Sequence, residues 1–229
     1  MSLAVIRSRS LDGLDTPEVT VEVHLANGLP SFTLVGLADT EVKEARERVR
    51  AALQNSGLEF PHNKRITVNL APADLPKESG RFDLPIALGI LAASGQIDAQ
   101  RLDAFEFAGE LSLAGDLRPV RGALAMGLAM QRRGVTRALE LPVGSAEEAA
   151  LVEGLSIHAA GHLLDVVRSL LPPETASPLP RAVAATARDA RNQPDLRDVK
   201  GQAAAKRAIS GAPSRHSTIA CAVQACRGR

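Results

Sequence analysis

A polar loop that leads into an apolar helix carries the side chains best placed to do chemistry. Lys77 and Arg81 stand before a helix that we expect to begin at Asp83. Cations beside a helix N-terminus, where backbone N–H groups point outward, could contact an anion or a charged partner. In the simpler interpretation, Asp83 caps the helix and both basic side chains are solvated. The spacing leaves both interpretations open.

No other local pattern forms a catalytic constellation. Glu78, Asp83 and Glu110 could pair for acid–base work, but turn and cap roles are commoner for such residues. The sequence holds no GxSxG, HExxH or GxGxxG pattern, and the phosphate-binding pattern GxxxxGK[ST] is also absent. We therefore predict that this chain is not an enzyme.

The histidines and cysteines do not predict a metal site. His158 and His162 are four residues apart, with no Cys or acidic partner at ligand spacing, whereas a metal site needs three or four convergent ligands. Cys221 and Cys226 both lie in the last nine residues. A structural disulfide framework is excluded, and we expect a cytoplasmic protein.

Composition predicts a folded chain with an aliphatic core. Hydrophobic residues make up 45% of the 229 residues and charged residues 23%, while aromatic residues make up only 2%, all of them Phe. Stacking platforms for single-stranded nucleic acid are therefore scarce. No apolar run approaches the ~18 residues of a membrane span, and the N-terminus does not resemble a signal peptide.

Charge is distributed unevenly along the chain. Residues 1–180 carry 17 Lys and Arg against 23 Asp and Glu, and residues 181–229 carry 10 against 3. Residues 1–180, with their excess of acidic side chains, are a poor candidate for binding phosphate backbones on their own. The basic end could touch nucleic acid, although a solvated tail is the simpler interpretation.

Periodicity predicts an α/β chain with a mixed sheet. Strands at residues 19–25 and 31–35 flank the turn signal Asn27-Gly28 and predict a hairpin. A helix follows from Asp39 to about Asn55, with a charged, solvated face. The later expected elements are strands 65–70, 105–113, 117–120, 138–141 and 155–159 and helices 83–93, 122–133, 146–152 and 163–171.

A change in composition marks the end of the folded domain. Five prolines and no periodicity mark residues 172–194 as a linker, so we place the end of the folded domain at about residue 171.

Several blocks of sequence, in order, resemble the N-terminal domain of the bacterial ComM/YifB family of magnesium-chelatase-like AAA+ ATPases. The resemblance covers residues 1 to about 171. Its most specific blocks are residues 34–39, 42–53, 66–77, 80–87, 109–115 and 118–122.

The resemblance implies an α+β fold like ribosomal protein S5 domain 2, shared with the proteolytic domain of Lon. A Lon-like peptidase needs a nucleophilic Ser and a neutral Lys to take its proton. Alignment with that family places Asp83 at the Ser position and Met126 about where the Lys would be, so neither role is filled. Ser79 with Lys77 remains as a residual pair.

Residues 195–209 look like the start of the family's ATPase domain, in which Lys200, Gly201 and Gln202 would lie near the adenine. Residues 210–229 depart from the family and are expected to be disordered. A shifted reading frame is one explanation for them. ATP and Mg²⁺ belong to the full-length relatives, and no cofactor is expected in this chain.

The resemblance therefore implies a non-catalytic accessory or interaction domain of a ring-forming ATPase that processes DNA during natural transformation. Self-association and DNA are the implied partners, and no membrane is expected. The alternatives are a vestigial or cryptic Lon-like Ser–Lys peptidase and an accessory subunit of a metal chelatase.

Overall fold

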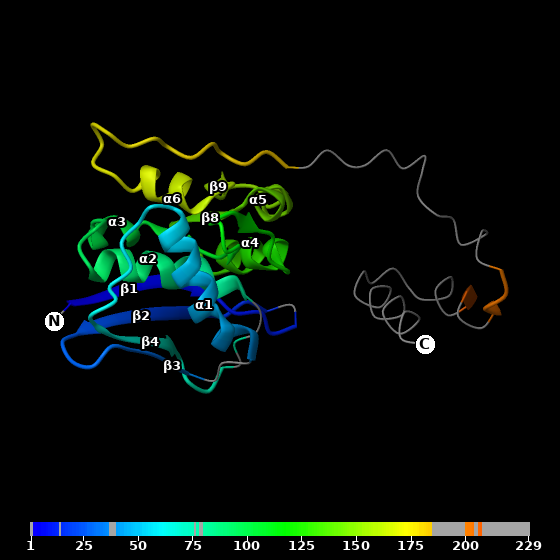
Figure 1. The fold of residues 1–229 in the computed structure, drawn as a ribbon. Helices are drawn as coiled ribbons and strands as arrows, with labels where there is room; N and C mark the ends of the chain where they lie inside the picture. Colours follow the sequence, from blue (N-terminus) through cyan, green and yellow to red (C-terminus); the bar gives the residue numbers. More distant parts are fainter. Residues whose placement is uncertain are drawn as a thin grey trace. The chain divides into compact units, whose positions relative to one another are not determined.

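The computed structural model describes residues 2–13, 15–36, 40–75, 77, 80–184, 200–203 and 206–207. The chain divides into two compact units, Met1–Ala185 and Thr186–Arg229. All the named strands and helices belong to the first unit, which runs from blue to yellow in Figure 1.

A four-stranded mixed sheet with the order β1-β2-β4-β3 is the base of the first unit. Its strands are β1 (Ser2–Arg9), β2 (Glu18–Ala26), β3 (Ser31–Val35) and β4 (Arg65–Ala71). Buried and partly exposed residues alternate along β2, because successive side chains point to opposite faces of a sheet. The half-buried strand predicted at residues 19–25 is confirmed.

The hairpin predicted between residues 19–25 and 31–35 is wrong. β2 pairs antiparallel with β1 on one side and with β4 on the other, so β3 finds no free side of β2. β3 instead pairs parallel with β4, and helix α1 (Thr40–Asn55) makes the crossover between them. β3 has only five residues and offers fewer ladder hydrogen bonds than the longer strands that displace it. β1 and β3 are therefore the edges of the sheet.

Helix α2 (Asp83–Ala93) is buried along nearly its whole length, as its apolar sequence predicted. It packs on β1 and β2. Gly89 permits a close approach, because a Cβ atom there would lie 2.4 Å from Cγ2 of Val23 and 2.8 Å from Cδ1 of Ile6. Figure 1 shows α1 and α2 on the same face of the four-stranded sheet.

A second, parallel sheet has the order β5-β8-β9 and packs with two helices around a second apolar core. The predicted strand at 105–113 is interrupted after residue 107, and its second part joins the next predicted strand in a small antiparallel hairpin around the turn Gly115-Asp116. The elements are β5 (Phe105–Phe107), β6 (Glu110–Leu111), β7 (Leu117–Arg118), α4 (Ala123–Arg132), β8 (Ala138–Pro142), α5 (Val143–Ala149) and β9 (Ile157–Ala160).

Three short helices complete the unit, namely η1 (Gly80–Phe82), α3 (Ala99–Leu102) and α6 (Leu163–Ser169). The predicted α+β class with a mixed sheet and packed helices is confirmed. The likeness to ribosomal protein S5 domain 2 stays a prediction. No helix in the described part of the chain combines the length and apolar character needed to cross a membrane.

The segment after α6 hydrogen-bonds to strand β9 within the first unit. The N–H of Ala159 donates to the carbonyl of Pro180 at 3.0 Å, and the N–H of Ala182 donates to the carbonyl of Ile157 at 2.8 Å. These residues belong to the stretch 172–194 that the sequence predicts as a linker. Residues 185–194 and the tail 210–229 lie outside the described residues, and the domain boundaries stay predictions.

Candidate functional site

Asp83 lies at the start of α2, in a buried ion pair with a residue of α1. Its carboxylate accepts hydrogen bonds from Nε of Arg48 at 2.7 Å and from Nη2 at 3.1 Å. The backbone N–H of Leu111 donates to the same carboxylate at 3.2 Å. The Asp83 side chain is fully buried, whereas the Arg48 side chain is 19% exposed. The pair thus joins α1, α2 and β6.

The predicted cap at Asp83 is wrong. The N-cap of α2 is Phe82, which makes no side-chain cap hydrogen bond, and Asp83 is the first residue of the helix proper. Its carboxylate reaches sideways to Arg48 rather than back to the helix N–H groups. The solvated charged face predicted for α1 is also wrong at Arg48, because that side chain points inward.

Burial sets the protonation of Asp83. Removal from water raises the pKa of Asp83 to about 6, while the hydrogen bond and charge of Arg48 oppose this shift. The same hydrogen bond raises the pKa of Arg48 above its ordinary value. The carboxylate is therefore a charged partner of Arg48 at neutral pH and becomes neutral in mild acid.

Lys77 and Arg81 are buried, so the interpretation of both as solvated side chains is wrong. Arg81 is 2% exposed and donates from Nη2 to the carbonyl of Arg121 at 3.0 Å. The Nζ of Lys77 donates to the carbonyl of Pro72. Burial lowers the pKa of Lys77, against the opposing charge of Asp74. An anion or partner contact by this pair stays a prediction.

The positions that the Lon resemblance assigns to a catalytic dyad hold no dyad. Met126 on α4 is fully buried in the second core, with Leu139 and Leu141 as neighbours in the same cluster. A thioether in this setting cannot take a proton from a hydroxyl. Ser79 of the residual pair, with Glu78, lies outside the described residues.

The two histidines four residues apart serve different elements. The ring of His162 caps α6 by accepting from the N–H of Leu164 at 3.0 Å. His158 instead lies on β9, with Nδ1 3.9 Å from the carboxylate of Glu140. Among the residues that the structure describes, no group of three or more His, Cys, Asp or Glu side chains could hold a metal ion.

A buried charge network, which the sequence analysis missed, ties the two sheets together. The Nε of Arg9 lies 2.6 Å from Oε2 of Glu106, and both side chains are fully buried. Arg137 lies 2.7 Å from the other oxygen of Glu106 and 2.5 Å from Glu18. Arg9 also donates to the carbonyl of Thr16 at 3.0 Å. The residues of this network are far apart in sequence, so no local sequence pattern predicts it.

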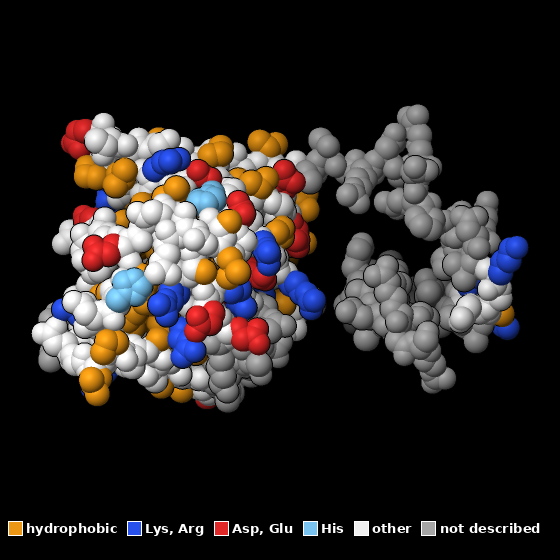
Figure 2. All heavy atoms as spheres, in the orientation of Figure 1, with side chains coloured by type: hydrophobic (Ala, Val, Ile, Leu, Met, Phe, Trp, Pro, Cys, Tyr) orange, Lys and Arg blue, Asp and Glu red, His pale blue; other side chains and the backbone are white. Residues whose placement is uncertain are grey.

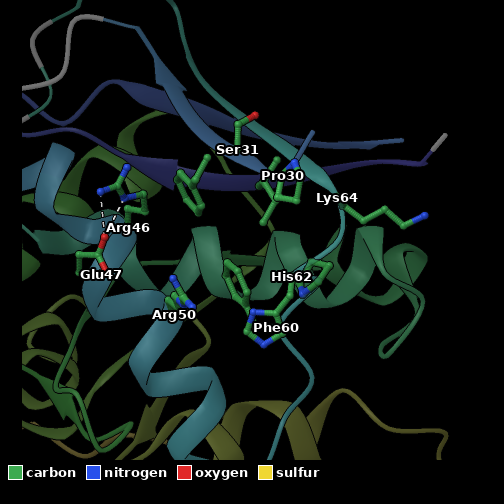
Figure 3. Close-up of a pocket in the computed structure, with 11 residues that line it drawn as sticks. Pro30, Ser31, Arg46, Glu47, Arg50, Phe60, His62 and Lys64 are labelled. Carbon is green, nitrogen blue, oxygen red and sulfur yellow. Dashed lines mark hydrogen bonds and ion pairs between the residues drawn. The ribbon is translucent and has the colours of Figure 1, made fainter. Parts of the chain in front are cut away.

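The sequence analysis also missed a pocket of about 550 Å³ on the α1 side of the sheet. Its walls come from residues 30–32, from Arg46, Glu47 and Arg50 of α1, and from residues 60–66. Figure 3 shows the α1 side chains on one side of the pocket and Lys64 on the other, with Phe60 and His62 between them. Three distant segments thus meet in one cationic and aromatic site.

The pocket side chains are arranged by a few specific contacts. Nη2 of Arg46 lies 2.9 Å from Oε1 of Glu47. The guanidinium carbon of Arg50 lies 5.8 Å from the centre of the Phe60 ring, a cation–π distance. The rings of Phe60 and His62 are tilted at 60°, with centres 5.4 Å apart. Nζ of Lys64 donates to Oδ1 of Asn27 at 2.7 Å.

The predicted adenine-side residues belong to the second unit. Gly201 and Gln202 have φ angles of 74° and 56°, and the N–H of Lys206 donates to the carbonyl of Gln202 at 3.0 Å. Lys200, the third of these residues, is exposed. Their role beside adenine stays a prediction.

The sequence of this chain matches a known protein family and several curated proteins. Residues 21–142 match the family model described as subunit ChlI of Mg-chelatase. The chain is 50% identical over 225 residues to competence protein ComM of Haemophilus influenzae, covering 96% of this chain and 43% of ComM.

Other relatives match to a similar extent. The chain is 47% identical to the uncharacterized protein YifB of Salmonella typhimurium, covering 91% of this chain and 40% of YifB. It is 36% identical to an uncharacterized protein of Mycobacterium tuberculosis, covering 91% of this chain and 41% of that protein. The chain therefore spans about two fifths of the length of these curated relatives.

Proposed function

Since the chain belongs to the ChlI-type Mg-chelatase family and is related to ComM and YifB, we propose that residues 1–171 form a non-catalytic interaction domain of an AAA+ ATPase. The match over residues 21–142 lies wholly inside the first unit, so the family relationship concerns the part of the chain that carries the two sheets.

The observation that carries this proposal is the buried pair of Asp83 and Arg48. In a Lon-like peptidase, the side chain at this point of the fold would have to reach the substrate. Asp83 is fully buried, and its carboxylate is held by Arg48 and by the N–H of Leu111. The residue thus joins three elements, which is a structural task rather than a chemical one.

One observation favours the peptidase alternative. Burial lowers the pKa of Lys77, and a lysine that loses its proton more readily is what a serine–lysine mechanism requires. Against this, the Nζ of Lys77 already donates to the carbonyl of Pro72 inside the loop. An amine held in this way is a poor base for Ser79.

A peptidase assay separates the two functions. The chain, its Ser79→Ala variant and its Lys77→Ala variant are incubated with unfolded casein, and new amino termini are counted over time. We expect the same background rate from all three proteins. Casein cleavage that disappears in both variants would show a working Ser79–Lys77 pair and reject the interaction-domain proposal.

The name of one longer relative supports a wider proposal. ComM is named a competence protein, and we propose that this domain serves an ATPase that processes DNA during natural transformation, as a ring in the cytoplasm. The printed 229 residues lack GxxxxGK[ST], so they are proposed not to hydrolyse ATP. Phosphate release from ATP and Mg²⁺, above that of a buffer blank, would contradict this.

A further inference from the structure

The pocket between α1, β3 and residues 60–66 is lined by cations, of which Arg46 is paired with the acid Glu47. Arg50 is exposed, and among the described residues no carboxylate lies within ion-pair distance of its guanidinium. The partner of Lys64 is the neutral side chain of Asn27. We propose that this pocket binds single-stranded nucleic acid, with one nucleotide seated inside it. The proposal deepens the interaction function above by naming a partner.

The charge of the pocket selects an anion. Its walls carry Arg46, Arg50 and Lys64 against a single acid, Glu47. The surrounding stretch of residues 1–180 has the opposite balance, with 17 basic against 23 acidic residues. Figure 2 shows Lys and Arg side chains over α1 on this face, with acidic side chains among them. A local cationic site on an acidic domain guides a negatively charged chain to one place.

The flat groups of the pocket select a base. Unstacked bases are held in proteins by stacking on aromatic rings, on His and on the guanidinium plane of Arg. Phe60 is only 8% exposed, so the flat surfaces open to a base are the guanidinium of Arg50, which lies over the Phe60 ring, and the exposed ring of His62 beside it. Two of the five Phe residues, Phe32 and Phe60, line this one pocket. The low aromatic content of the whole chain therefore does not exclude stacking here.

Size and surroundings favour a single strand over a duplex. A volume of about 550 Å³ falls in the usual range for small-molecule sites and suits one nucleotide. Hollows of about 390 Å³ and 620 Å³ adjoin it, because they share Pro61 and Lys64 with it on one side and Phe60 and His62 on the other. An unpaired base of a flexible strand suits hollows of this size, whereas the bases of a duplex are already stacked and paired.

An acidic peptide would meet the same cations but would leave the flat surfaces unused. Amide side chains in the adjoining hollows, among them Gln54, Asn63 and Gln96, supply donors and acceptors suited to base edges, and Glu59 is the one acid that lines both hollows. The pocket as a whole therefore fits a nucleotide chain better than a run of carboxylates.

Binding of a fluorescein-labelled oligothymidine to the full chain, followed by anisotropy, tests this proposal. Arg50→Ala should weaken binding about fivefold or more, because it removes a charge and a stacking surface. Glu47→Gln should strengthen binding about twofold, because it removes the only acid of the walls. Raising salt from ~50 to ~200 mM should weaken binding roughly tenfold if about two or three phosphates are neutralised.

Arg132→Ala is the matched control, since Arg132 is an exposed arginine of helix α4 away from the pocket. It should bind like the unchanged chain. Equal weakening by Arg132→Ala and Arg50→Ala, or an unchanged affinity in Arg50→Ala, would overturn the proposal and leave binding to the basic tail.

Two further outcomes would overturn it. They are equal affinity for a duplex of the same sequence, and full displacement of the strand by a polyglutamate peptide at equal charge concentration. None of these results depends on the casein assay, so a failure here leaves the non-catalytic proposal standing, and cleavage of casein leaves this one standing.

Discussion

Two sets of charged side chains in this molecule differ in what holds them. Inside the fold, Glu106 is shared by Arg9 and Arg137, and Asp83 is held by Arg48, so both of these buried carboxylates have an arginine partner. At the pocket, Arg46 is paired with the exposed acid Glu47, whereas Arg50 lies over the Phe60 ring and Lys64 donates to the neutral side chain of Asn27. The first set stabilises the fold, and the second remains available for a ligand.

Helix α1 carries members of both sets. Arg46 and Arg50 are four residues apart and share one face, whereas Arg48 is turned by about 200° from Arg46, since each residue adds about 100°. Arg48 therefore points to Asp83 while its neighbours point to the pocket. Arg48 is therefore held in a buried ion pair, whereas Arg46 and Arg50 line the pocket, because the helix turns them toward different parts of the molecule.

The largest effect is expected where a buried carboxylate is removed. Glu106→Ala leaves Arg9 and Arg137 without their shared partner and should lower the free energy of unfolding by about 3–5 kcal/mol. Urea denaturation measures this change. Glu147→Ala, at an exposed position of α5, is the control and should change it by less than about 0.5 kcal/mol. Similar values for both variants would show that the network contributes nothing.

The next effect concerns pH and Asp83. Its folded-state pKa of about 6 lies above the ordinary 3.8, so between these values the folded protein holds a proton that the unfolded chain has released. Stability from this group is therefore present below about pH 4 and is lost as pH rises through 6, by about 3 kcal/mol at most. Asp83→Asn lacks this dependence.

The measurement is the difference in unfolding free energy between the unchanged chain and Asp83→Asn, taken at pH 4 and pH 7. Titration of the other carboxylates cancels in that difference. We expect the difference to favour the unchanged chain more at pH 4. If the difference favours the unchanged chain more at pH 7 than at pH 4, the Arg48 ion pair stabilises the charged carboxylate more than burial destabilises it.

The smallest effects compare two arginines of α1. Arg48→Ala should lower the free energy of unfolding by about 2 kcal/mol, because it leaves the Asp83 carboxylate buried with only the Leu111 N–H beside it. Arg50→Ala should change it by less than about 0.5 kcal/mol, as expected for an exposed site. Melting curves of the two variants, recorded side by side, check the order. A larger loss of stability in Arg50→Ala than in Arg48→Ala would contradict the distinction between buried charges that stabilise the fold and pocket charges that do not.

Sequence reasoning predicted what depends on neighbours along the chain. The helices predicted at 39–55 and 83–93 follow from their apolar side chains and from the glycines that come after them, and they are present as Thr40–Asn55 and Asp83–Ala93. The buried character of α2 also follows from composition alone. Family membership was predicted from ordered blocks of sequence, and the comparisons confirm it.

What sequence reasoning missed depends on contacts between distant segments. The hairpin failed because β4, some thirty residues further on, competes for the same side of β2. The partner of Asp83 lies 35 residues away on α1. The pocket draws its walls from three segments, and its few aromatic residues matter only because two of them meet there. Amino-acid composition alone could not show that two phenylalanines line the same pocket.

The edge strand β3 has a consequence for the behaviour of the molecule in concentrated solution. Among the described strands only β4 pairs with it, so its outer backbone groups are open to a strand of another molecule. It is only five residues long, and its outward side chains include Ser31 and Thr33. A foreign chain therefore finds few bonds to make there, and the same short strand that shapes a wall of the pocket discourages polymerisation through the sheet.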